Sequence, residues 1–84
     1  MKDLKGAESV AQIIENDLKD IFNTDFIYIK IEAIDYNTYK IKAELLNDYI
    51  EKVYKWNINL PYYINLSSFI DIIKKDIILY KYEL

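Results

Sequence analysis

Two alternating runs with a short polar segment between them constrain the fold of this chain more than any other feature. In residues 26–35 the alternate positions 27, 29, 31 and 33 hold three isoleucines and an alanine, and in residues 39–45 apolar residues alternate with lysine and glutamate. A period of two is typical of strands with one face on a hydrophobic core. The intervening Asp35-Tyr36-Asn37-Thr38 predicts a turn, because asparagine tolerates positive φ. The two runs therefore predict a β-hairpin whose apolar face must be covered.

A third strand is indicated beyond the hairpin, although its pattern is less regular. Tyr54, Trp56, Ile58 and Leu60 occupy alternate positions, which predicts a strand over residues 53–60. Pro61 has no N–H to donate to a strand ladder, so we expect the strand to end there. Residues 49–52 are consistent with a loop, a bulge or a single helical turn.

Helical patterns flank the three strands. The apolar stripe in residues 9–22 predicts a helix with a capping box at Ser9 and Gln12, and Asn23 is suited to the left-handed residue that ends a helix. A second helix is predicted over residues 68–80, with Ser68 as its cap. Residues 78–84 also alternate, so a short final strand is the alternative there.

The order of these elements predicts the fold class. The sequence indicates α-β-β-β-α, an α+β domain in which two helices flank a three-stranded antiparallel sheet and bury its apolar face. Eighty-four residues leave no room for a second domain, so we expect one domain over residues 1–84.

Composition excludes most catalytic chemistry. The chain has no cysteine, histidine or arginine, which removes thiol and imidazole catalysis, disulfides and zinc sites built on those ligands. The serines have no imidazole to activate them, and Asp17, Asp20 and Asp25 lack the spacing of a calcium loop. We therefore expect a protein that is not an enzyme and that uses neither a metal nor a cofactor.

Charge and hydropathy narrow the partners and the compartment. Fourteen acids against eleven lysines give a net charge of −3, which opposes direct binding to nucleic acid. The first six residues lack the apolar segment of a signal peptide, and no run approaches the roughly 18 apolar residues of a membrane span. The expected location is the cytoplasm of the host cell, without membrane contact.

Acids on the first predicted helix form one candidate binding site. They could be presented to a basic groove on a partner protein, or they could simply be the solvated back of an amphipathic helix. The candidate acids are Glu8, Glu15, Asp17 and Asp20.

Aromatic residues form the other candidate site. The chain has nine tyrosines, and buried tyrosine needs a hydrogen-bond partner for its hydroxyl, whereas tyrosine and tryptophan are common anchors of protein interfaces. Surface anchors and core residues remain alternative interpretations. The candidate anchors are Tyr54, Trp56, Tyr62 and Tyr63.

The second predicted helix is apolar over more of its circumference than one contact face needs. The simplest explanation is a helix buried across the sheet. The alternative is the seam of a homodimer, since small domains often cover excess apolar surface by pairing.

The order of elements resembles the double-stranded-RNA-binding domain, but Ser67, Ser68 and Asp71 stand where that family has lysines, so its function is not expected. In size, acidity, A/T-rich coding style and element order the chain is similar to the small anti-CRISPR proteins of phages and mobile elements. That resemblance implies a non-catalytic inhibitor that covers the nucleic-acid-binding surface of a larger protein, such as a CRISPR effector. A small homo-oligomeric regulatory or accessory protein, similar to an antitoxin, is the alternative.

Overall fold

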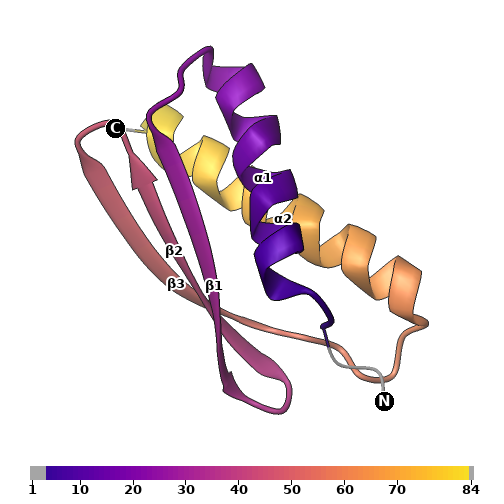
Figure 1. The fold of residues 1–84 in the computed structure, drawn as a ribbon. Coiled ribbons are helices and arrows are strands. Elements are labelled where there is room, and N and C mark those ends of the chain that lie inside the picture. The colour runs from indigo at the N-terminus through magenta and orange to yellow at the C-terminus, as the bar shows by residue number, and fades with distance from the viewer. Residues whose placement is uncertain (1–3, 84) are drawn as a thin grey trace.

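The protein folds into two layers, a sheet and a pair of helices. The computed structural model describes residues 4–83, with side chains for residues 4–82. The three strands form an antiparallel sheet in the order β1-β2-β3, and both helices lie on the same face of it (Figure 1). The predicted α+β class and the order α-β-β-β-α are confirmed. The elements are α1 (Ala7–Phe22), β1 (Ile27–Asp35), β2 (Thr38–Leu45), β3 (Asp48–Lys55) and α2 (Tyr62–Glu83).

Helix α1 ends as the sequence predicts but begins differently. Asn23 adopts the left-handed conformation with φ of 51° and its N–H donates to the carbonyl of Asp20, so it ends the helix. The N-cap is Gly6, with φ of 63°, and no side chain caps the helix. The capping box predicted at Ser9 is wrong, because Ser9 already lies in the first turn.

Gly6 offers a test of this helix start. A Cβ at Gly6 would approach the Cβ and Oγ of Ser9, at 3.8 and 3.9 Å, so space is available and the backbone conformation is the obstacle. We expect Gly6→Ala to lower the free energy of unfolding by about 1–2 kcal/mol. Gly6→Asn should lower it less, because asparagine tolerates positive φ. Urea unfolding followed by circular dichroism measures both, and equal losses would contradict the assignment.

The third strand lies nearer the hairpin than predicted. It pairs with β2 from Leu45↔Asp48 to Thr38↔Lys55 without interruption, and a tight turn with Leu46 at φ of 58° joins the two strands. The predicted strand over residues 53–60 is wrong beyond Lys55. The register places Lys52 opposite the buried Ile41, on the face of the sheet that the helices cover. Because a charged residue occupies this position, the apolar-polar alternation of β3 is not visible in the sequence.

Helix α2 is longer than predicted at both ends. The carbonyl of Pro61 accepts the first helical hydrogen bond, from the N–H of Asn65 at 3.0 Å, and the helix begins at Tyr62, six residues before the predicted start at Ser68. Ser68 therefore lies within the helix and caps nothing. The chain stays helical through Glu83, so the alternative of a final strand is wrong, and Leu84 lies outside the described residues.

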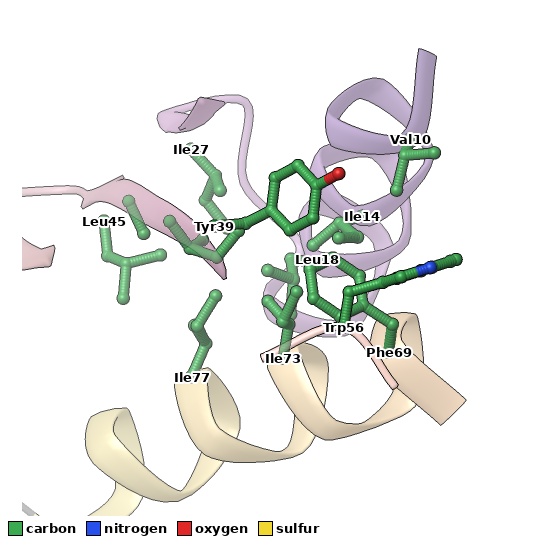
Figure 2. Packing of buried hydrophobic residues seen from close by; sticks show 12 residues of the cluster. Val10, Ile14, Leu18, Ile27, Tyr39, Leu45, Trp56, Phe69, Ile73 and Ile77 are labelled. Atoms are coloured by element: carbon green, nitrogen blue, oxygen red, sulfur yellow. The ribbon is translucent and has the colours of Figure 1, made fainter. Parts of the chain in front are cut away.

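The core lies between the sheet and the helices. In Figure 2 the side chains of α1 and α2 point toward one another and toward the strands. Ile14, Leu18 and Ile73 are fully buried, and they fix both helices against the sheet. The buried apolar side chains are Val10, Ala11, Ile14, Leu18, Ile27, Tyr39, Ile41, Ala43, Leu45, Trp56, Phe69, Ile73 and Ile77.

The connection from β3 to α2 is held by a buried polar residue. Asn65 is 4% exposed, and its side-chain amide donates to the carbonyl of Asn57 at 2.6 Å. The N–H of Leu60 donates to the same carbonyl, at 3.2 Å. This arrangement fixes the segment that carries Trp56 into the core.

Candidate functional site

The carboxylate of Glu15 caps one backbone N–H at the outer edge of β1. Its carboxylate accepts a hydrogen bond from the backbone N–H of Ile29 at 3.0 Å and forms an ion pair with Lys19 at 3.1 Å. The side chain is 13% exposed. Burial by itself would raise the pKa of Glu15, but the hydrogen bonds from Ile29 and Lys19 outweigh it and lower the pKa. Glu15 is therefore committed to the fold and is not presented to solvent.

The other candidate acids do not gather into one patch. Asp17 forms an ion pair with Lys74 at 2.9 Å, which links α1 to α2 on the side of α1 away from β1. Glu8 and Asp20 are exposed, and they lie near opposite ends of the helix. The structure thus separates the four acids instead of bringing them together.

Trp56 is part of the core. It is 1% exposed, and its ring packs edge-on against Phe69 and Tyr39 at centroid distances of 5.2 and 6.4 Å. Figure 2 shows it between the two helices. Of the two interpretations of this residue, the structure favours core packing, and in this conformation Trp56 cannot contact a partner.

Tyr54 and Tyr62 mainly link separate segments of the fold through hydrogen bonds of their hydroxyl groups. The hydroxyl of Tyr54 donates to Asp76 at 2.8 Å, and Lys52 contacts the same carboxylate oxygen at 2.9 Å. Burial and the Asp76 carboxylate raise the pKa of Tyr54 well above its ordinary value. The half-buried Tyr62 accepts a hydrogen bond through its hydroxyl from the backbone N–H of Lys5 at 3.2 Å.

Tyr63 is the most exposed of the candidate aromatics, at 82%, and its ring contacts only that of Tyr62 among the described ring pairs, edge-on at a centroid distance of 5.5 Å. It begins a surface on the N-terminal half of α2 that we call the α2 outer face. This surface forms a shallow hollow, and Asp71 is its only charged residue. It consists of Tyr63, Ile64, Ser67, Ser68, Asp71 and Ile72.

The α2 outer face was only partly accessible to sequence reasoning. The excess of apolar residues on the second helix was visible, and Ile64 and Ile72 are indeed 59% and 50% exposed. Because the helix starts six residues earlier than predicted, Tyr63 and Ile64 lie outside every element that the sequence predicts, and the sequence does not place them on one face with Asp71.

The sheet face opposite the helices is a balanced, charged surface. Across it Lys30 and Lys42 both pair with Glu32, and Lys40 pairs with Glu51. The pairing of these charges is typical of a solvated face, and it leaves little net field to attract a charged partner.

The charges outside ion pairs are mostly negative. Within residues 4–82, Lys5, Lys55 and Lys75 are the lysines without an ion pair. The excess negative charge therefore remains available at the surface. The carboxylates without an ion pair are those of Glu8, Asp20, Asp25, Asp35, Glu44 and Asp71.

Searches for similar proteins add no assignment: no family model, no curated protein and no solved structure matches this chain. Among the described residues no group of three or more carboxylates could hold a metal ion. Neither of the two helices in that part of the chain has the length and apolar content needed to cross a membrane.

Proposed function

We propose that this chain is a non-catalytic protein-binding inhibitor that occupies a nucleic-acid-binding surface of a larger protein, such as a CRISPR effector in the cytoplasm of the host cell. The observation that carries the proposal is the α2 outer face. Tyr63, Ile64 and Ile72 are exposed there around a single acid, Asp71. An exposed aromatic and aliphatic cluster with a polar surround is typical of a protein interface.

Charge supports the choice of partner. The first twelve residues of α2, 62–73, contain Asp71 and no lysine, and the unpaired charges elsewhere on the described surface are mainly acidic. Surfaces that bind nucleic acid are basic, and an acidic domain is attracted to them. The contact set is therefore revised from the sequence prediction: Tyr63 is kept, Asp71 is added, and Glu15 and Trp56 are assigned to the fold.

A cleavage assay tests the proposal. Purified CRISPR nucleases loaded with guide RNA are incubated with the chain, and cleavage of a matching DNA target is followed. We expect inhibition of at least one nuclease, and we expect Tyr63→Ala combined with Asp71→Lys to weaken binding at least tenfold, since each anchor at an interface contributes about 1–2 kcal/mol or more.

Tyr36→Ala is the matched control, because Tyr36 is 72% exposed and lies in the turn between β1 and β2. It should inhibit as well as the original chain. Inhibition that survives the double substitution would remove the α2 outer face as the contact surface. If a panel of loaded nucleases is neither bound nor inhibited, the inhibitor function is wrong.

A further inference from the structure

The two edge strands of the sheet differ in the side-chain contact made to their backbone. On β1 the outward N–H of Ile29 is bound by the carboxylate of Glu15. β3 is the other edge strand, on the side of the sheet away from α1 (Figure 1). It is eight residues long, and its pairing with β2 has no bulge. A regular open edge is a template for pairing with another strand.

The strand register fixes which backbone groups point outward from β3. In an antiparallel pair, successive residues face the neighbouring strand and the outer side in turn. The N–H of Trp56 donates to the carbonyl of Asn37 at 2.7 Å, so alternate residues counted back from Trp56 face β2. The backbone groups of Glu51, Val53 and Lys55 therefore point toward the open edge.

The side chains along this edge are complementary to themselves when the register is centred on Val53. If a second β3 runs antiparallel with Val53 opposite Val53, then Glu51 of each copy lies opposite Lys55 of the other. Lys55 has no ion pair within the described chain, and Glu51 has one exposed pair, with Lys40 at 3.3 Å. Registers centred on Lys52 or on Glu51 would instead place like charges opposite each other, which is destabilising.

The position of helix α2 is compatible with the same two-fold axis between the paired β3 strands. Lys52 and Tyr54 both contact Asp76, so Asp76 lies next to the middle of β3 on the helix-covered face, with its charge paired by Lys52. Ile72 and Leu79 lie one turn to either side of Asp76, and they are 50% and 45% exposed. The axis brings Ile72 of one copy toward Leu79 of the other, which extends the contact from the strands to the helices.

We propose that β3 is a self-association surface, at which two copies of this chain pair antiparallel about Val53 into a continuous six-stranded sheet. The two Glu51–Lys55 pairs set the register, and Ile72 and Leu79 provide apolar contact below it. The interface is isologous, as in most dimers. This inference rests on the edge of β3 and not on the proposed inhibitor function, although Ile72 belongs both to this interface and to the α2 outer face.

Sedimentation equilibrium over a concentration range of roughly 1 µM to 1 mM tests the pairing. We expect the purified chain to pass from monomer to dimer within this range. Glu51→Lys and Lys55→Glu should each weaken dimerisation at least tenfold, because each places like charges opposite across the interface. An equimolar mixture of these two variants should dimerise again, because both pairs then have opposite charge.

Asp20→Lys is the matched charge reversal, on the exposed side of α1, and should dimerise like the original chain. Circular dichroism establishes that each variant is folded. Val53→Pro is a second, independent test of the pairing. Proline at this position removes only a backbone N–H that points outward from β3, so we expect a folded monomer. A strict monomer at every concentration, or single variants that dimerise normally, would overturn the proposal, and so would failure of the mixture to recover dimers.

Discussion

Replacing Trp56 by alanine is expected to lower the free energy of unfolding by about 3–5 kcal/mol, the typical loss for truncating a large buried aromatic side chain. Trp56 is 1% exposed, and its ring contacts those of Phe69, Tyr39 and Tyr62. Truncation removes these contacts and leaves a cavity between the two helices. Thermal and urea unfolding followed by circular dichroism measure the loss, since the only tryptophan is removed.

The control for Trp56→Ala is truncation of Tyr63, an exposed aromatic residue from the same set of candidate anchors. Tyr63→Ala should change the free energy of unfolding by less than about 0.5 kcal/mol, because the residue is 82% exposed. Trp56→Phe should fall between the two. If Trp56→Ala leaves stability unchanged, Trp56 is not a core residue and returns to the list of surface anchors.

Replacing Glu15 by alanine is expected to lower the free energy of unfolding by about 1.5–3 kcal/mol, the range for a hydrogen bond to a charged group. The substitution leaves the edge N–H of Ile29 without its carboxylate and Lys19 without its ion pair. Glu15→Gln should cost less, because the amide oxygen can still accept from Ile29. Urea unfolding at neutral pH, followed by the fluorescence of Trp56, gives both values.

The same carboxylate predicts a dependence on pH. The pKa of Glu15 is lowered in the folded protein from its ordinary value of 4.5, so the ionised form is bound more strongly when folded. Its contribution to stability is complete above pH 4.5 and is lost as the pH falls through the lowered pKa. In Glu15→Gln the loss of stability on acidification should be smaller than in the original chain. Equal acid sensitivity would show that Glu15 does not hold the edge of β1.

Glu15 and Trp56 show which properties of the candidate site the sequence predicts and which it does not. The sequence marks Glu15 as one acid of an amphipathic helix, and a neighbouring Lys19 suggests only a weak pair on the helix surface. Its actual partner, the N–H of Ile29, is on another element, and no periodicity within either segment reveals that contact. Trp56 was likewise ambiguous, because alternation with Tyr54 predicts a shared face without showing whether a helix covers it.

The errors at element boundaries have a related cause. Lys52 occupies an inward position in β3, which a hydrophobic pattern does not predict, because its charge is neutralised by Asp76 of α2. The sequence does not predict the start of α2, because no side chain caps it in the pattern of a capping box. The first helical hydrogen bond joins the backbone of Asn65 and Pro61, and the side-chain amide of Asn65 is bound to the carbonyl of Asn57.

The sequence by itself determined the order of the five elements, the antiparallel hairpin and the exclusion of thiol and imidazole chemistry, because strand alternation, helical periodicity and residue type are local properties of the chain. Only the tertiary structure decided which acids are committed to the fold, which tyrosines remain exposed and which edge strand has a backbone N–H capped by a side chain. Each of those outcomes depends on a contact between segments far apart in the chain. Burial and charge pairing at such contacts are set by the packing of the helices on the sheet.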